Sequence, residues 1–278
     1  MIAAALALGS SVAWGASDFL AGTRARRMAV LAVLLLSQCT SAAIVLALTV
    51  IDGAPPPAAG HLLFAAAAGV TDGAMLFCLY RAMAIGNMGV VAPLAGCGAI
   101  VPLAVTVAIG DGLSALQLAG IAVALCGTMI AARETAPGPA ATALIAGAGL
   151  ALAASLFDGV SILAMDAAAD GGAIWAVLVD RLAAVALLAG VAAHARVRIR
   201  AGRRDATALA AIGGLDIVAQ LLFAFALTRG HVGVVAALGT LYPVTTVLLA
   251  GTLLRERPDR TKRVGVGACL AGVVMLSV

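Results

Sequence analysis

One short stretch occurs twice in this chain and decides how the rest is interpreted. Residues Gly86–Leu94 read G-N-M-G-V-V-A-P-L, and residues Gly230–Leu238 read G-H-V-G-V-V-A-A-L. Self-similarity at a long, fixed offset indicates that a chain is built from repeated units. Any fold for this chain must therefore contain the same unit twice.

The composition indicates a membrane protein. Hydrophobic residues make up 63% and charged residues 11% of the 278 positions, and the mean hydropathy is +1.13. A soluble domain has roughly 45–50% apolar and about 25% charged residues. The apolar runs are continuous and do not alternate with polar residues, which favours spanning helices over the strands of a membrane barrel. We predict an all-α integral membrane protein.

Ten transmembrane helices are predicted from the apolar runs, arranged as two inverted five-helix repeats. They cover residues 2–22, 29–51, 60–85, 88–109, 113–132, 140–165, 173–194, 205–228, 232–254 and 261–278. A proline- and glycine-containing stretch, 135–139, predicts a linker between a first repeat, 1–134, and a second, 140–278. Since each half holds an odd number of spans, the second half should lie upside down relative to the first. Inverted repeats of this kind are typical of transporters, with the substrate site near the midplane.

The two halves can be aligned beyond the opening stretch. A shift of 144 residues places Gly69 on Gly213 and Asp72 on Asp216. After one inserted residue, Asp111 aligns with Glu256. Matches of alanine or valine are frequent by chance in such a chain, but matches of acids and of spaced glycines are not.

Loop charges support the inversion independently. Arg24, Arg26 and Arg27 follow the first span, whereas the matching connection after the sixth carries Asp166 and Asp170. The connection after the second span has no arginine, whereas its counterpart has five: Arg196, Arg198, Arg200, Arg203 and Arg204. The positive-inside rule makes the arginine-rich connections cytoplasmic, so that both termini lie outside.

Several motifs, in order and in two copies, resemble the EamA-type transporters of the drug/metabolite transporter superfamily. The first span carries W-G-A-S-D-F at Trp14–Phe19, and the second copy of the repeated stretch runs on to Pro243. The family's G-E-R-x-S-x-x-Q-x-x-G signature has counterparts at Gly110–Gly120, where Asp111 replaces the usual glutamate, and at Arg255–Gly265. The resemblance implies a transporter. Members are commonly drawn with cytoplasmic termini, which differs from the charge count.

Ionisable residues inside the predicted spans are the main candidates for a site. The five acids and one base are Asp18, Asp72, Asp158, Asp180, Asp216 and Arg181. A charge at a helix centre costs roughly 2.5–3.5 kcal/mol on insertion scales, so these groups should face a polar interior or pair with each other. One structural alternative is a pair between Arg181 and a single acid of another helix. Asp180 should point about 100° away from Arg181 around the helix, which does not favour that pair.

Asp72 and Asp216 are the strongest candidates because they lie mid-span and are related by the repeat. Gln220 lies one turn beyond Asp216 on the same face. We hypothesise that this acidic pair lines a central cavity and binds a proton or a cationic group. Gln38 and Arg181 occupy nearly equivalent places in the second and seventh spans and should both face inward.

The amphipathic aromatic residues have two interpretations. Trp14, Tyr80, Trp175 and Tyr242 are first interpreted as anchors at the membrane interface. Trp14 lies inside its span, however, and could stack on a ligand. Tyr242 precedes Pro243 within the ninth span, where the missing amide of proline predicts a kink.

The leading hypothesis is a secondary transporter that moves a small metabolite or drug-like molecule across the bacterial inner membrane by alternating access, with possible proton coupling. The alternative is a membrane receptor or scaffold that transports nothing. An enzyme is not expected, because the chain has no nucleophile–base pair, metal-ligand cluster or nucleotide-binding motif. We expect no cofactor and no nucleic acid. The expected partners are a small-molecule substrate, membrane lipid and, in an oligomer, a second copy of the chain.

Overall fold

The computed structural model describes residues 2–86, 88–102, 105, 114–131, 139–197, 202–254 and 260–276. Within these residues the fold is all α-helical. In chain order the helices are α1 (Ile2–Ala25), α2 (Val30–Asp52), α3 (Ala59–Ile85), α4 (Met88–Ala95), the 3-10 helix η1 (Gly96–Ala99), α6 (Ala115–Ala131), α7 (Pro139–Ala169), α8 (Ala173–His194), α9 (Arg203–Leu227), α10 (Val232–Gly239), α11 (Tyr242–Leu253) and α12 (Arg260–Leu276).

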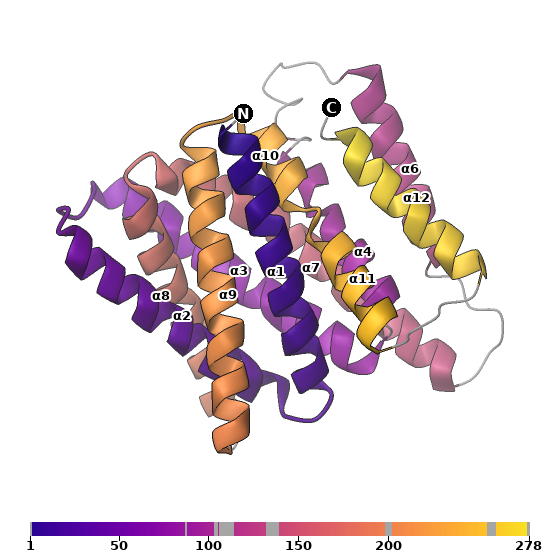
Figure 1. Cartoon of the computed structure of the whole chain (residues 1–278), viewed down its shortest axis with the longest axis horizontal. Coiled ribbons are helices and arrows are strands. Elements are labelled where there is room, and N and C mark those ends of the chain that lie inside the picture. Colours follow the sequence, from indigo (N-terminus) through magenta and orange to yellow (C-terminus); the bar gives the residue numbers. More distant parts are fainter. Residues whose placement is uncertain are drawn as a thin grey trace.

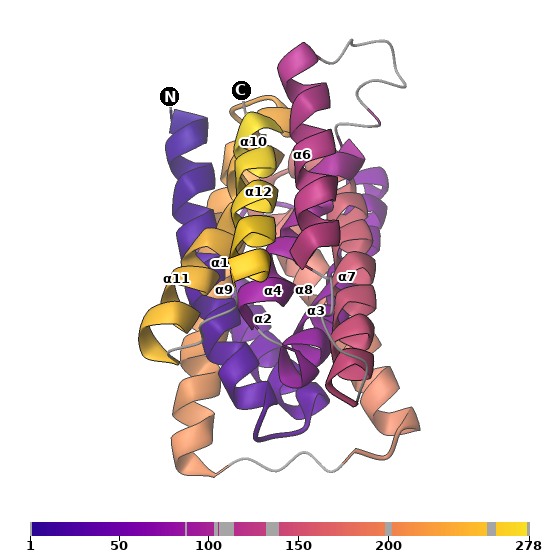
Figure 2. The same cartoon turned by 90° about the vertical axis from the view of Figure 1, so that its right-hand side faces the viewer.

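Six of the described helices are long and apolar enough to cross a membrane. They are α1, α2, α3, α8, most of α7 (Ala146–Ala169) and most of α9 (Asp205–Leu227). These six pack into one bundle, and α6 and α12 pack on each other at its side, next to α4 (Figures 1 and 2). The prediction of an all-α multi-pass membrane protein is therefore confirmed. Predicted and observed bounds agree closely for most elements, and for α8 they are identical.

Two predicted spans are not continuous helices. The ninth is divided into α10 and α11, which are separated at Thr240–Leu241. The prediction that Pro243 kinks an unbroken helix is therefore wrong. Pro243 lies in the first turn of α11, where its missing amide needs no intrahelical acceptor. The fourth span changes from α4 to the tighter η1 at Gly96, and most of its remainder lies outside the described residues. The predicted linker 135–139 and the first signature motif at Gly110–Gly112 also lie almost wholly outside them.

The distribution of polarity is that of a membrane bundle. Large apolar side chains face outward along the helices; Val50, Ile51 and Leu63 are each more than 70% exposed. Charged and amide side chains such as Arg181, Asp216 and Gln38 are buried. A soluble protein shows the reverse. The bundle therefore suits an apolar solvent outside and holds its polar chemistry inside.

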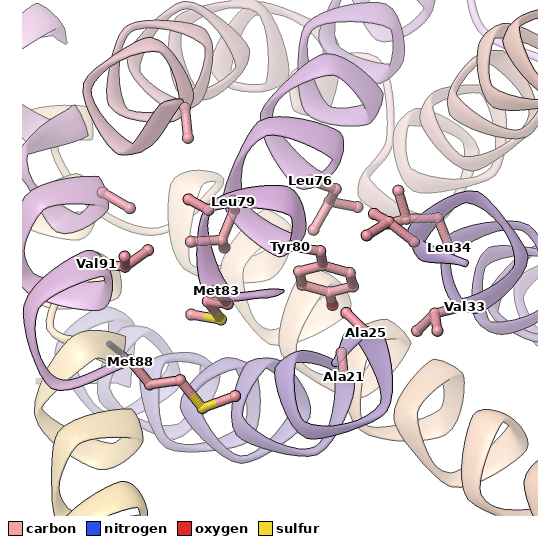
Figure 3. Packing of buried hydrophobic residues seen from close by; sticks show 14 of the residues in the cluster. Ala21, Ala25, Val33, Leu34, Leu76, Leu79, Tyr80, Met83, Met88 and Val91 are labelled. Carbon is pink, nitrogen blue, oxygen red and sulfur yellow. The ribbon is translucent and has the colours of Figure 1, made fainter. Parts of the chain in front are cut away.

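Buried apolar residues form two clusters, one toward each end of the bundle. The first, the arginine-end cluster, joins the second half of α1 and α3 to the start of α2, α4 and α9, with Ala25, Leu34, Leu79, Met83 and Met88 among its members (Figure 3). The second, the terminal-end cluster, joins the start of α1, α3 and α8 to the end of α2, α7 and α9, with Ala7, Val45, Ala65, Ala168 and Leu227 among its members. The middle of each long helix lies between the two clusters.

The arginine-rich connections and the chain ends lie at opposite ends of the bundle. Helix α1 begins and α12 ends at one end, whereas the α1–α2 turn, the end of α8 and the start of α9 lie at the other (Figures 1 and 2). There Arg24 Nη1 lies 2.8 Å from Asp205 Oδ1. The carbonyl of Gly86, at the α3–α4 turn, accepts from Arg26 Nη2 at 3.2 Å at this end. Gly230, at the α9–α10 turn, packs against Ala3 at the other end. Each copy of the repeated stretch thus begins at an interhelical turn and continues into a short helix, α4 or α10, and the two turns lie at opposite ends.

Contacts between the halves occur in matched pairs. Ser17 Oγ on α1 donates to the Ile212 carbonyl on α9 at 3.1 Å. Its counterpart 144 residues later, Ser161 Oγ on α7, donates to the Ala68 carbonyl on α3 at 3.2 Å, and Ala68 is likewise 144 residues before Ile212. Helix α7 therefore packs on α3 in the same way as α1 packs on α9.

Candidate functional site

A polar layer crosses the bundle between the two apolar clusters. Asp18 on α1, Asp72 on α3, Asp158 on α7 and Asp216 on α9 point into it, and α8 contributes Asp180 and Arg181. Gln38 on α2 completes it. Arg181 and Asp180 are each 0% exposed. The five acids singled out in the sequence thus lie in one central layer, where Asp158 is half-buried and the other four are buried.

Arg181 is the hub of this layer. Its Nε donates to Asp180 Oδ2 at 2.7 Å, and its Nη2 donates to Asp72 Oδ2 at 2.7 Å. Its Nη1 donates to Asp216 Oδ2 at 2.9 Å and to Gln38 Oε1 at 2.7 Å. The planar guanidinium can serve several acceptors at fixed angles, which a lysine could not. One side chain therefore joins four helices, two from each half of the chain.

Two sequence-based expectations about Arg181 are corrected by this geometry. We expected the base to neutralise a single acid, but it contacts three carboxylates. We also expected Asp180 to point away, yet its carboxylate receives the Nε–H of its chain neighbour. The 100° offset applies to Cβ positions. The arginine side chain is long enough for its Nε to reach the Asp180 carboxylate in spite of that offset, so the spacing does not exclude an Arg181–Asp180 pair.

Asp216 has the densest set of partners, and one of them was not foreseen. Besides Arg181, its Oδ2 accepts from Gln38 Nε2 at 3.2 Å. Ser41 Oγ on α2 lies 3.0 Å from the same oxygen and 2.8 Å from the Gly213 carbonyl, and its single proton can serve one of them at a time. Nothing in the sequence distinguishes Ser41 from the other small polar residues that fill membrane helices.

Two glycines related by the repeat bring the acid-bearing helices close enough for these bonds. A Cβ on Gly69 of α3 would overlap the carbonyl of Asp180 on α8, and a Cβ on Gly213 of α9 would overlap the carbonyl of Ser37 on α2. Each glycine lies three residues before an acid of the layer, Asp72 or Asp216, and hence on nearly the same helix face. Only glycine permits this approach, so the close packing is part of the site.

A cavity of about 30 Å³ opens on one side of the Arg181 hub. Seven of the ten candidate residues line it: Trp14, Asp18, Asp72, Asp158, Asp216, Gln220 and Tyr242. The other three, Gln38, Asp180 and Arg181, lie behind the wall. Lining residues that the sequence did not single out are Met75, Leu76, Ser161, Ile162, Met165, Phe223, Gly239 and Thr240. A cavity of this size holds about two water molecules, so a larger solute must widen it in order to bind.

Aromatic side chains form part of the wall. Trp14 and Phe223 lie with their ring centroids 5.1 Å apart and their planes tilted by 53°. Tyr242, at the start of α11, also faces the cavity. The alternative in which Trp14 and Tyr242 are membrane-interface anchors is therefore not supported. Trp175 differs: it lies outside the cavity and donates through Nε1 to the Ala54 carbonyl at 3.0 Å.

Three buried polar atoms have no hydrogen-bond partner among the described residues. They are Asp158 Oδ2, Asp180 Oδ1 and the Tyr242 hydroxyl. Asp158 and Tyr242 line the cavity, whereas Asp180 does not. The Asp158 carboxylate lies directly over Gly98 of η1, where a Cβ would collide with it. The corner formed by Asp158 and Tyr242 therefore borders the cavity and holds two polar atoms that are covered by protein and unpaired within the described structure.

The cavity wall is acidic. Four carboxylates line it, and no lysine, arginine or histidine does so among the described residues. Arg181 lies behind the wall with every bond described above directed at protein acceptors. No group of three or more His, Cys, Asp or Glu residues suited to a metal ion occurs in the described part of the chain. What the wall can do chemically is accept hydrogen bonds and stabilise positive charge.

Comparison with known proteins finds a family match for the second half of the chain. Residues 145–278 match the model of the EamA-like transporter family. No curated protein matches the chain. A solved structure titled only "Crystal structure of protein" is similar over 98% of this chain and 95% of its own, with 19% identity and a TM-score of 0.69. At this identity the likeness shows a shared fold. It covers the first half of the chain as well as the second.

Proposed function

Since residues 145–278 belong to the EamA-like transporter family, within the drug/metabolite transporter superfamily, we propose that this protein is a secondary transporter. It moves a small metabolite or drug-like molecule across the bacterial inner membrane by alternating access. The observation that carries the proposal is the acidic cavity in mid-bundle, closed toward each end by an apolar cluster. A site that must face either side in turn needs a closure on both sides, and the two clusters supply them.

We further infer that the two halves are inverted repeats of five spans each. The matched serine bonds support this, as do the equivalent approaches of Gly69 and Gly213. The two copies of the repeated stretch lie at opposite ends of the bundle, as copies of opposite orientation should. Inverted repeats give a transporter two equivalent ways to pack, and exchanging these packings moves the opening from one face to the other.

The interruptions in the fourth and ninth spans support a binding site at the centre. The α10–α11 break lies at the cavity, since Gly239, Thr240 and Tyr242 line it, and η1 contacts the lining residue Asp158 through Gly98. Transporters commonly place such breaks at midplane sites, because irregular backbone is tolerated in a membrane only where protein or water covers it. The positive-inside rule assigns the arginine-rich end to the cytoplasm and the termini to the outside.

Transport is powered in this proposal by a solute or ion gradient. Asp72 and Asp216 both line the cavity and both bind Arg181. These two acids can couple transport to the gradient, since a proton or cation that binds to either carboxylate competes with the Arg181 guanidinium for it. The proposal requires that Asp72→Asn and Asp216→Asn each lower transport at least about tenfold, as expected when a charge-assisted bond is lost.

The test is solute flux in vesicles that contain the purified full-length chain. Uptake and efflux are measured over a panel of cationic, neutral, zwitterionic and anionic solutes, with and without an imposed pH gradient. Substrate-dependent flux that is lost in the two variants and kept in Asp52→Asn, an exposed acid at the end of α2, supports transport. Flux at the wild-type rate and pH dependence in both variants refutes the role of the pair. Saturable binding without flux of any panel solute would favour the receptor alternative.

A further inference from the structure

We propose that the cavity selects organic ammonium ions that carry at least one N–H donor, and that Asp158 and Tyr242 receive the ammonium group. This inference rests on the proposed transport function and names the substrate class of the same site. It commits to a cation with an apolar or aromatic body. Anions, amino-acid zwitterions and neutral analogues are rejected.

Two buried polar atoms of the cavity residues have no hydrogen-bond partner among the described residues, and they indicate which group a ligand must supply. Tyr242 is 4% exposed. Neither its hydroxyl nor Asp158 Oδ2 has a hydrogen-bond partner among the described residues. Buried polar atoms in proteins are almost always hydrogen-bonded, so exceptions call for an explanation. Both residues line the cavity. A carboxylate can only accept, and a phenol oxygen can also accept, so the missing partner is a donor such as an ammonium N–H.

The charge around the cavity is negative, which favours a cationic ligand. Asp18, Asp72, Asp158 and Asp216 line it, and no basic residue does so in the described part of the chain. Arg181 is the nearest base, and it is held by three carboxylates and Gln38 at 2.7 to 2.9 Å. A substrate carboxylate would therefore meet acids and find no free cation. Zwitterions and anions are disfavoured, whereas a positive charge is attracted from several sides.

The aromatic and apolar side chains of the wall indicate what the part of the ligand beyond its charged group should be. Trp14 and Phe223 pack against each other at 5.1 Å and line the cavity beside Met75 and Ile162. Aromatic faces attract cations, and the interaction is stronger where water is excluded. A bare metal ion would instead need several oxygens around one point, and the described residues offer no such group. The wall therefore fits an organic cation better than an inorganic one.

The chain offers a built-in reporter for the test. It has two tryptophans, Trp14 in the cavity and Trp175 outside it. In a Trp175→Phe protein the tryptophan fluorescence, excited at wavelengths that tyrosine does not absorb, comes from Trp14 alone. Binding to the full chain in detergent or vesicles is then measured with four probes on one skeleton: 2-phenylethylamine, 2-phenylethanol, 3-phenylpropanoate and phenylalanine. A second set on a butyl skeleton (butylamine, butanol and butanoate) tests whether the ring is needed.

The inference expects saturable quenching by the amines and at least about tenfold weaker binding by the other probes, which corresponds to about 1.4 kcal/mol. Asp158→Asn, introduced into the Trp175→Phe protein, should weaken amine binding about tenfold or more because a charge-assisted bond is lost. Tyr242→Phe should weaken it by less. Gly98→Ala should also weaken it, since the new methyl group displaces the Asp158 carboxylate without changing any charge. Asp166→Asn, on the same helix but outside the cavity, is the matched control and should bind as the parent does.

Several results would overturn the inference. They are equal binding of amine and alcohol, tighter binding of phenylalanine, no binding of either amine, or undiminished amine binding in Asp158→Asn. Flux separates this failure from failure of the broader proposal. If vesicles move a zwitterion or anion while amines do not bind, the transporter stands and the ammonium site falls. If nothing binds and nothing moves, both fall.

Discussion

The two sides of the polar layer are built in opposite ways. Around Arg181 the charges are paired: three carboxylates and an amide bind one guanidinium at 2.7 to 2.9 Å, and only Asp180 Oδ1 among these acceptor groups has no partner within the described residues. At the Asp158–Tyr242 corner a carboxylate oxygen and a hydroxyl have no protein partner in the described structure. The difference teaches that buried charge serves two purposes here. One set holds helices in place, and the other stays available to something that arrives.

Substitutions on the two sides of the polar layer should have different effects on stability. Removing one partner of a buried ion pair typically costs about 3–5 kcal/mol, because the charge that remains is buried and uncompensated. Removing a group that had no partner exposes no such charge. Changes on the Arg181 side should therefore act first on stability, and changes on the open side should act first on binding.

The largest effect is expected from Arg181→Gln. The change leaves three buried carboxylates facing each other and should lower the free energy of unfolding by about 3–5 kcal/mol. Thermal unfolding of the detergent-solubilised protein and the yield of folded protein both report it. The matched control is Arg229→Gln, at an exposed arginine that contacts Phe225 near the end of α9. If both variants unfolded at the wild-type temperature, the hub would not be a stabilising element.

A smaller effect is expected when the close helix approaches behind the Arg181 side are blocked. Gly69→Ala and Gly213→Ala each force a methyl group against a backbone carbonyl and should cost about 1–3 kcal/mol. The neighbouring Gly214 faces open space, so Gly214→Ala should be neutral or stabilise by up to about 1 kcal/mol through helix propensity. Unfolding temperatures of the three variants decide the matter. Tolerance at Gly69 and Gly213 alike would show that the approach is not tight.

The paired bonds between the halves should have equal strength. Ser17→Ala and Ser161→Ala each remove one buried side-chain bond to a carbonyl on a facing helix and should each cost about 0.5–1.5 kcal/mol. Ser11→Ala, which loses a bond only within its own helix, should cost less. Unfolding temperatures of the three proteins test this. A large loss for one of the paired serines and none for the other would count against the equivalence of the two interfaces.

The smallest effect on stability is expected at the open corner. Asp158→Asn and Tyr242→Phe should change the free energy of unfolding by less than about 0.5 kcal/mol, because the atoms they alter make no protein hydrogen bond whose loss would cost about 0.5–1.5 kcal/mol. Their effect should appear in ligand binding. Unfolding and Trp14 fluorescence measured on the same preparations separate the two readouts. A loss of stability as large as that of Arg181→Gln would show that the corner is structural.

Much of the architecture was predictable because the membrane restricts the choices. Continuous apolar runs can only span as helices here, and the helix bounds follow from where such runs stop; α8 matched to the residue. Interruptions within runs were harder to predict. Pro243 was assigned to a helix interior, because an apolar sequence shows that a proline is present but not which side of a helix break it occupies. The break becomes visible only when α11 is seen to begin at Tyr242.

The candidate site was predictable in membership and not in arrangement. Charge inside a span is costly enough that each such residue stands out without any structure. Which of the acids bind Arg181 and which do not could not be predicted, because all five acids look alike in sequence. Phe223, Met75 and Ser41 gave no signal, since apolar and small polar residues occur throughout every span.

From the sequence alone the chain could be identified as a helical membrane protein, and the few residues that carry its polar chemistry could be named. This was possible because lipid penalises every misplaced charge and every unpaired backbone group, and both leave a local trace. Which three acids Arg181 binds, and that Asp158 is left without a partner for one oxygen, became evident only in the tertiary structure. That choice depends on the reach of one long side chain and on two glycine contacts, and both exist only once helices that are distant in sequence have packed together.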